Sequence, residues 1–340
     1  MQTTKSCSHA KFWVVIVALV GILGFSLLLN AGLTVGLLVR HRPAKERGMG
    51  TDEYPQFTER HSYGKGDVKA VRIELTGVIT RAREAGPFGG SVDMTESILR
   101  QIRAAQNDDD VRAIILEVDS PGGEITPTDE IYRALKEFRG SSDERRVVVF
   151  IRDLAASGGY YASMAADAII AEPTAMIGSI SVIMQTLNWR TLSEKIGIED
   201  VTIASGRNKD LLNPFREVNP EHVKMLQQII DQLHARFADV VREGRSLEAE
   251  AVASIADGSV FSANDAVAKN LIDSIGDWDD AVARTAKLLG ERSVRVVRYE
   301  RHVRLADLFS QVEGPMEPLN RLGRLLPSTR GPRFLYLWQP

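Results

Sequence analysis

The sequence predicts an α/β fold built on a parallel β-sheet. Short apolar runs with strand character alternate with longer runs in which apolar residues recur at helical spacing. Two apolar runs lead directly into glycine turns, DSPGG at 119–123 and SGGYY at 157–161. Because strand, turn and helix alternate along the chain, neighbouring strands are expected to run parallel.

The expected elements follow one another in a regular order. Residues 68–79 alternate as a strand does, and 94–106 have helical spacing. Pro127 stands near the start of the second helix, and Asn219 before Pro220 is a plausible cap for a long one. The expected strands are 68–79, 111–123, 146–151, 167–173 and 294–300, and the expected helices are 94–106, 127–139, one opened by Ser157, 189–198, 220–242 and further helices within 246–290. Residues 327–340 carry an apolar patch that is either an edge strand or an arm docking on another subunit.

Composition excludes two classes of protein. The 340 residues are 44% hydrophobic, enough for a sizeable core, and the net charge of -3 gives no basic field for nucleic acid. Cys7 is the single cysteine, so neither an intrachain disulfide nor a cysteine metal cluster is possible. We expect no metal site and no cofactor.

An uncharged run from 12 to 39 predicts a membrane anchor, because it exceeds the roughly 20 residues that a spanning helix needs. A cleaved signal peptide is the less favoured alternative, since its apolar region would be shorter and a cleavage site clearer. The expected organisation is a tail at 1–11, the anchor at 12–39, a polar linker at 40–66, a globular domain at 67–300 and a C-terminal arm at 301–340.

Ser157 opens a helix, which allows two interpretations. A serine at this position is usually a cap, but a nucleophile at a helix N-terminus also benefits from the helix dipole and from the neighbouring N–H of Gly158. Serine hydrolysis also needs a base. None of the six histidines (His9, His41, His61, His222, His234 and His302) is placed convincingly to serve Ser157.

A lysine can replace histidine as the base where burial leaves its amine neutral. Lys209 follows an apolar run in SGRNKD, although a lysine in a loop is usually just a solvated charge. The DSPGG turn could bring backbone N–H groups close to a substrate carbonyl, or it could be an ordinary turn. A further glycine turn, IGSISVI at 177–183, offers Ser179 as a hydrogen-bond partner.

Taken together and in this order, DSPGG, ASGGYYAS, IGSISV and SGRNKD resemble the motifs of the bacterial signal peptide peptidase A family. The resemblance covers about 68–275. It implies a Clp-protease/crotonase-like fold, a repeated β-β-α spiral preceded by one transmembrane helix, and membrane-anchored Ser/Lys peptidase activity. The single copy of the core implies the short, homo-oligomeric form.

The resemblance also implies a role for each site residue. Ser157 matches the nucleophile and Lys209 the general base, with Ser179 holding the lysine amine. Gly123 and Gly158 match the oxyanion-hole donors. The family commonly has glycine where Ser181 stands, a departure that bears on substrate preference more than on activity.

We therefore expect a serine endopeptidase that degrades membrane-derived peptides such as cleaved signal peptides. The resemblance implies a ring-shaped homo-oligomer with sites shared between subunits, anchored in membrane lipid through 12–39. Lysines and arginines around the anchor favour a cytoplasmic domain by the positive-inside rule, whereas the family places it on the extracytoplasmic side of the bacterial inner membrane, and we follow the family. The alternatives are a catalytically silent membrane scaffold and a crotonase-type acyl-CoA enzyme.

Overall fold

The computed structural model describes two units, Met1–Gly50 and Thr51–Pro340. Residues 13, 16–17, 19–27 and 30 are described in the first unit, and 51–81, 83–85, 91–300 and 334–338 in the second. The described residues of the first unit are helical, and no described helix combines the length and apolarity that crossing a membrane requires. The predicted tail at 1–11 and much of the predicted anchor at 12–39 lie outside the described residues.

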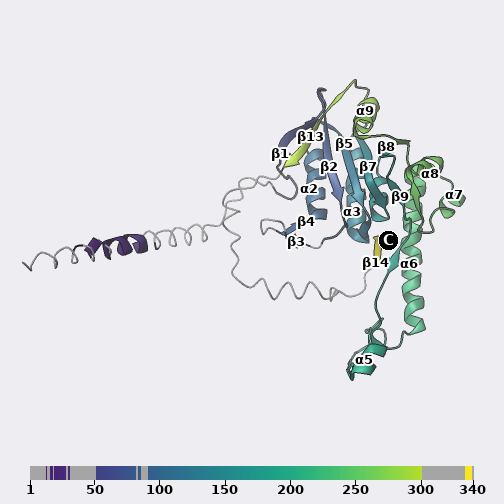
Figure 1. The fold of residues 1–340 in the computed structure, drawn as a ribbon. Coiled ribbons are helices and arrows are strands. Elements are labelled where there is room, and N and C mark those ends of the chain that lie inside the picture. The colour runs from purple at the N-terminus through teal and green to yellow at the C-terminus, as the bar shows by residue number, and fades with distance from the viewer. Residues whose placement is uncertain are drawn as a thin grey trace, which may run out of the picture. The chain divides into compact units, whose positions relative to one another are not determined.

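A mixed α/β core with a mainly parallel sheet dominates the second unit (Figure 1). The sheet order is β1-β13-β2-β5-β7-β8-β12, and β9 joins β7 to β11. The central pairs β2–β5, β5–β7 and β7–β8 are all parallel, which confirms the predicted sheet. The strands of this sheet are β1 (Thr58–Tyr63), β2 (Val68–Thr76), β5 (Val111–Ser120), β7 (Arg146–Ala156), β8 (Ala168–Ala171), β9 (Met176–Gly178), β11 (Val260–Ser262), β12 (Ser274–Ile275) and β13 (Val294–Glu300).

Helices cover both faces of the sheet. The larger hydrophobic core contains side chains of α2, α3, α4 and α6, and α9 packs on the other face. Strand β5 is buried along nearly its whole length, as expected for a central parallel strand. The helices are α2 (Met94–Gln106), α3 (Ile125–Gly140), α4 (Gly158–Ser163), α5 (Arg190–Ile196), α6 (Pro220–Arg245), α7 (Ala249–Ala253), α8 (Ala263–Ala268) and α9 (Trp278–Leu288).

Local chemistry explains where the helices begin. The Asp93 carboxylate accepts the backbone N–H of Glu96 at the start of α2, and Asn219 caps α6 before Pro220, as predicted. Residues 58–63, within the range expected to be linker, instead form β1, which pairs antiparallel with β13. Its side chains are mostly exposed, so the sequence carries little of the apolar alternation that marks a strand.

Two smaller sheets also lie among the described residues of the second unit. β3 (Arg83–Ala85) pairs with β4 (Ser91–Asp93). β14 (Phe334–Leu337) is the central strand of the other, between β6 (Gly122–Glu124) and β10 (Ile183–Met184). The C-terminal apolar patch is therefore a strand, but it lies between two partners instead of at an edge. Residues 301–333, most of the predicted arm, lie outside the described residues.

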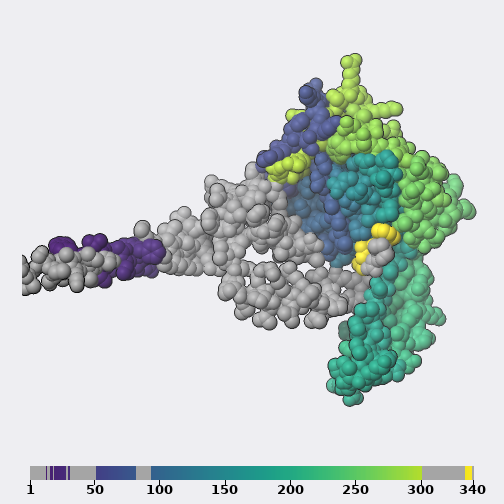
Figure 2. Space-filling model, in the orientation of Figure 1, coloured from purple at the N-terminus to yellow at the C-terminus, as the bar shows by residue number. Residues whose placement is uncertain are grey.

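Residues 185–219, which we call the loop arm, project from the core together with the first turns of α6 (Figure 1, Figure 2). The loop arm carries α5 near its tip. Apolar side chains on it face water, and Ile203 is 96% exposed. Large apolar residues exposed on the loop arm are Leu187, Trp189, Leu192, Ile196, Ile198, Val201, Ile203, Phe215 and Val218. Such a surface is typical of a protein–protein contact.

Candidate active site

Ser157 lies at the junction of β7 and α4, fully buried beneath the core surface. It is 1% exposed and has φ +52° and ψ −114°, a conformation that serine rarely adopts. Its N–H donates to the Gly178 carbonyl (2.7 Å), and its own carbonyl accepts the N–H of Tyr161 (2.9 Å). The side chain stands at the N-cap position but makes no capping hydrogen bond. Capping therefore does not explain this serine, and its strained backbone is typical of a functional site.

Ser179 occupies the equivalent position on the neighbouring strand. The parallel register pairs Ala156 of β7 with Gly178 of β9, so the two serines follow paired residues. Ser179 is also buried and also has φ +52°, and its N–H donates to the Ser259 carbonyl (2.7 Å). The register thus brings together two of the residues predicted from the sequence.

The DSPGG turn closes against the start of α4. Gly122 has φ +93°, and a Cβ built on it would lie 2.5 Å from the Gly158 nitrogen, a distance that no real side chain tolerates. The Ser120 hydroxyl fixes this turn by accepting the N–H of Gly122 (3.1 Å) and donating to the Gly77 carbonyl (2.6 Å). Gly123 forms a bridge with Ile79, whose carbonyl a Cβ on Gly123 would meet at 2.0 Å. Glycine is required at both positions because the backbones approach so closely.

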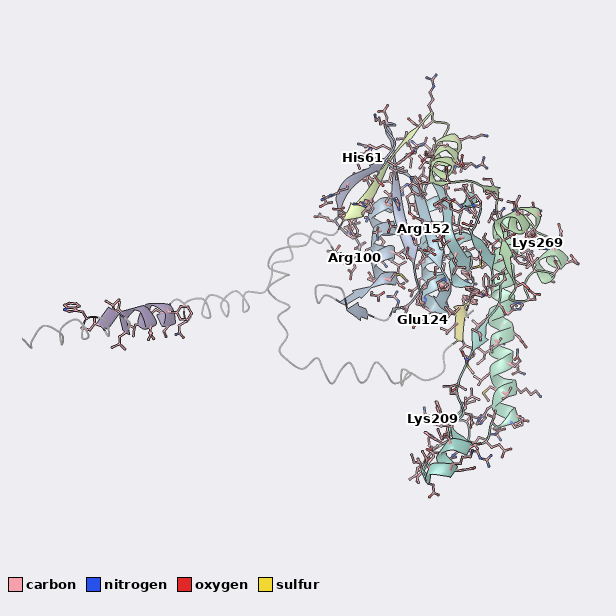
Figure 3. The ribbon with its side chains drawn as sticks, viewed as in Figure 1. His61, Arg100, Glu124, Arg152, Lys209 and Lys269 are labelled. Carbon is pink, nitrogen blue, oxygen red and sulfur yellow. The ribbon has the colours of Figure 1, made fainter. Side chains whose placement is uncertain are left out.

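Lys209 lies on the loop arm, where the structure keeps it apart from the serines. It is exposed and lies in a turn, where its backbone N–H donates to the Gly206 carbonyl (3.0 Å). Figure 3 shows it near α5, away from the sheet to which Ser157 is attached. One chain therefore brings Ser157, Ser179, Gly123 and Gly158 together but does not bring Lys209 to them.

An ion-pair network holds the turn that carries Lys209. Arg216 pairs with Asp200 (3.2 Å) and with Asp210 (3.0 Å), which directly follows the lysine. The Thr202 hydroxyl and Asn213 amide also donate to Asp200, and these bonds hold the pKa of Asp200 below its ordinary value. The turn thus has a defined conformation although it is exposed. The sequence analysis did not predict this network, because nothing in the order of these residues indicates which of them pair.

The sequence analysis also missed an aromatic cluster beside Ser157. The Tyr161 ring contacts Phe237 of α6 and Tyr336 of β14, with ring centroids 5.1 and 5.2 Å away. Burial and a hydrogen bond to Asp129 (2.6 Å) raise the pKa of Tyr161, so its hydroxyl is a donor. The only available signal was the apolar FLYL run near the C-terminus.

Asp129 ties this aromatic cluster to α6. Its carboxylate accepts from Tyr161 and pairs with Arg236 (2.5 Å) and Arg133 (2.8 Å). Burial raises the pKa of Asp129, but the hydrogen bonds from Tyr161 and Arg236 outweigh burial and lower it below its ordinary value. The folded state therefore favours the carboxylate.

Replacing Asp129 with asparagine is expected to change stability mainly above the pH at which an ordinary carboxyl titrates. A lowered pKa adds stability that is present above about pH 4 and is lost as the pH falls through the folded-state pKa. The wild-type free energy of unfolding should thus exceed that of Asp129→Asn near neutral pH, and the two should converge in acid. Urea unfolding across this range measures the difference. The control is Asp109→Asn at an exposed turn, and an equal gap at every pH would contradict the assignment.

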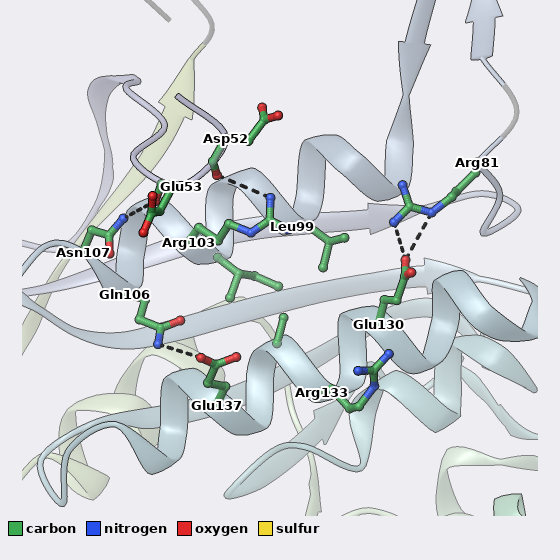
Figure 4. A pocket seen from close by; sticks show the side chains of 12 residues that line it. Asp52, Glu53, Arg81, Leu99, Arg103, Gln106, Asn107, Glu130, Arg133 and Glu137 are labelled. Carbon is green, nitrogen blue, oxygen red and sulfur yellow. Dashed lines mark hydrogen bonds and ion pairs between the residues drawn. The ribbon is translucent and has the colours of Figure 1, made fainter. Parts of the chain in front are cut away.

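A separate cavity of about 650 Å³ lies along α2 and α3 and contains none of the predicted site residues (Figure 4). Several of its charged side chains form ion pairs, and Arg103 and Arg133 pair with Glu96 and Asp129 outside the lining. Arg81 pairs with Glu130, and the Gln106 amide donates to Glu137 (3.4 Å). Among the described residues no group of histidine, cysteine, aspartate and glutamate side chains could hold a metal ion.

Comparisons with known proteins identify peptidases as relatives of the chain. Profiles of peptidase family S49 and of Clp protease match residues 140–292 and 89–189. The chain is 33% identical over 237 residues to a putative signal peptide peptidase SppA from Enterococcus faecium, covering 70% of this chain and 68% of that protein. It is 33% identical over 222 residues to a putative protease from Synechocystis, covering 65% of this chain and 75% of the relative. It is 35% identical over 217 residues to Protease 4 from Salmonella typhi, and this match covers 64% of this chain but only 34% of Protease 4.

The matches and the fold together define the class: the chain is a serine peptidase with a mixed α/β fold consistent with a Clp-protease-like core. More narrowly, it belongs to peptidase family S49. The resemblance noted in the sequence is thereby confirmed at the level of the family.

Proposed function

We propose that the chain is a membrane-anchored endopeptidase in which Ser157 is the nucleophile and Lys209 of a neighbouring subunit is the base. The observation that carries this proposal is the buried, strained Ser157 at the start of α4, beside a glycine turn that admits a peptide backbone. The exposure of Lys209 within one chain supports sharing, because a lysine becomes an effective base only where packing removes its amine from water.

The exposed apolar side chains of the loop arm favour a homo-oligomer as the source of that packing. Burying Val201 and Ile203 against another copy would remove apolar surface from water and cover the neighbouring turn that carries Lys209. In this proposal Ser179, which follows the residue paired with Ala156, hydrogen-bonds the incoming lysine amine. We take the assembly to be a ring, as the family resemblance implies.

The reaction is an acyl transfer in two halves. Ser157 Oγ attacks the substrate carbonyl while Lys209 takes its proton, and the N–H groups of Gly123 and Gly158 stabilise the oxyanion. The protonated lysine then donates to the departing amine. Water, activated by the same lysine, releases the acyl group and regenerates Ser157.

The substrate class follows from the relatives and from the N-terminal sequence. One relative is named a putative signal peptide peptidase, and the uncharged run at 12–39 fits a bilayer anchor. We therefore propose cleaved signal peptides and other membrane-derived peptides as substrates, at the bacterial inner membrane, with the catalytic domain on the extracytoplasmic side.

Labelling with a fluorophosphonate tests the nucleophile directly. This reagent phosphonylates a serine hydroxyl only where a base and an oxyanion site activate it. Peptide mapping should find the adduct on Ser157 in the folded assembly and on no serine after unfolding in urea. Buried Ser163, whose hydroxyl donates to the Gly159 carbonyl (2.8 Å), is an internal control and should stay unmodified. Labelling elsewhere, or none in an assembly that cleaves peptides, would contradict the role of Ser157.

A further inference from the structure

The Ser120 hydroxyl lies inside the glycine turn that packs against the start of α4. Ser120 is 0% exposed, and its oxygen donates to the Gly77 carbonyl (2.6 Å) while accepting the N–H of Gly122 (3.1 Å). One buried hydroxyl, acting as donor and acceptor at once, thus joins the residue that follows β2 to the turn that follows β5.

Backbone hydrogen bonds hold the same two segments together on either side of this hydroxyl. The Gly77 N–H donates to the Asp119 carbonyl (2.9 Å), and the Ile79 N–H donates to the Gly122 carbonyl (2.8 Å). Because these bonds are made by the backbone, they persist whatever side chains the segments carry. Ser120 is therefore the residue at which a substitution can loosen the turn without removing its other bonds.

The bonds to Gly122 fix the direction of the Gly123 N–H. Gly122 is held at both of its polar groups, its N–H by Ser120 and its carbonyl by Ile79. Because a trans peptide unit is planar, its carbonyl and its N–H point in opposite directions, so a held Gly122 carbonyl aims the N–H of Gly123. Gly122 has φ +93°, in a region where a residue without a side chain moves freely, so the turn depends on these bonds for a single conformation.

Ser120 also packs against the other half of the predicted oxyanion hole. A Cβ built on Gly159 would lie 2.8 Å from the Ser120 carbonyl oxygen and 3.2 Å from the Ser120 Cβ. Gly159 directly follows Gly158, the second expected donor. The same serine is therefore in contact with both segments that carry the expected donors, the turn with Gly123 and the first residues of α4.

We propose that Ser120 is a positioning residue, whose hydroxyl holds Gly122 so that the Gly123 N–H points to the oxygen that becomes negative when Ser157 attacks a peptide carbonyl. The hydroxyl acts through the backbone and not by contact with the substrate. Hydrogen-bond donors stabilise a transition state best when they are aimed at the developing charge before the reaction begins. The inference rests on the proposed function, because it gives Ser120 a part in the acyl transfer at Ser157.

The kinetics of Ser120→Ala test this role, with Ser163→Ala as the matched control. Ser163 is also 0% exposed and also donates to a backbone carbonyl, that of Gly159 (2.8 Å). The fluorophosphonate adduct on Ser157, taken to completion, counts the competent sites, so unfolded protein does not enter the rate. Per competent site, Ser120→Ala should lower kcat about tenfold or more and change KM by less than about twofold, because an oxyanion donor acts in the transition state. Ser163→Ala should keep its kcat.

The pH profile separates positioning from a general disturbance of the site. A misdirected oxyanion donor leaves the base unchanged, so kcat/KM should rise at the same pH in Ser120→Ala and in the unaltered protein. Ser120→Cys is a second variant, because its thiol fills the space of the hydroxyl but donates and accepts hydrogen bonds only weakly. It should show the same loss of kcat, and it decides the question if Ser120→Ala does not assemble.

An unchanged kcat per site in Ser120→Ala and Ser120→Cys, or an equal loss in Ser163→Ala, would overturn the inference. A raised KM with kcat unchanged would also overturn it, since Ser120 would then serve substrate binding. A displaced pH profile would do the same. Cleavage that persists in Ser157→Ala would contradict the proposed function itself, whereas an inactive Ser157→Ala beside a fully active Ser120→Ala would contradict this inference alone.

Discussion

Replacing Ser157 with alanine is expected to abolish peptide cleavage while leaving the protein folded. Loss of the nucleophile should lower kcat by at least about 10³-fold, because no other group supplies the covalent step. Stability should change by less than about 1 kcal/mol, since the serine side chain makes no capping hydrogen bond. The measurements are cleavage of a fluorogenic apolar peptide between about pH 6 and 10, and thermal unfolding.

Ser163→Ala is the matched control for this experiment. Ser163 is also a buried serine of the α4 region, but its hydroxyl donates to the Gly159 carbonyl within the helix. Its replacement should leave most of the activity in place. Retained cleavage in Ser157→Ala would remove this serine from the mechanism and favour a different nucleophile.

Replacing Lys209 with alanine is also expected to cause a large loss of peptide cleavage, although this side chain is exposed in the single chain. A surface lysine normally tolerates substitution, so loss of activity by about 10²-fold or more would mark a role as base. Lys209→Arg should not rescue the activity, because a guanidinium stays protonated. Lys195→Ala, at another exposed position of the loop arm, is the control and should be active.

Mixing the two inactive proteins separates a shared site from a site within one chain. Subunits carrying Ser157→Ala still supply Lys209, and subunits carrying Lys209→Ala still supply Ser157. Exchange between the two assemblies should therefore restore part of the activity. If subunits exchange, as followed by a fluorescent label, and no activity returns, each site belongs to a single chain.

Much of the fold could be predicted because the local signals were strong. The expected helix at 94–106 matches α2, because its apolar residues recur at helical spacing. The buried runs that form β5 and β7 were equally clear, and their parallel pairing followed from the helices between them. β1 was missed because an exposed edge strand lacks the alternation on which such predictions depend.

The site was predictable only where its parts are set by local geometry. Ser157 and Ser179 follow paired residues of β7 and β9, and Gly158 follows Ser157 directly. The sequence analysis grouped these residues through the resemblance of their motifs to a known family. The place of Tyr336 could not be predicted, because pairing between β14 and β6 joins residues far apart in sequence and β14 is only a short apolar run. The separation of Lys209 from Ser157 in one chain has no signal in the residues themselves, and only the family resemblance, which implies sites shared between subunits, suggested it.

If the loop arms of neighbouring copies bury their exposed apolar side chains, as the shared-site proposal requires, activity depends on chain concentration. Apolar surface left in water costs roughly 25 cal/mol per Å², and Val201 and Ile203 are 80% and 96% exposed. Under the shared-site proposal, a newly made chain carries both halves of the chemistry but cannot use them until it meets other copies. Peptide cleavage should then rise more steeply than in proportion to chain concentration, so that scarce, scattered chains cleave little.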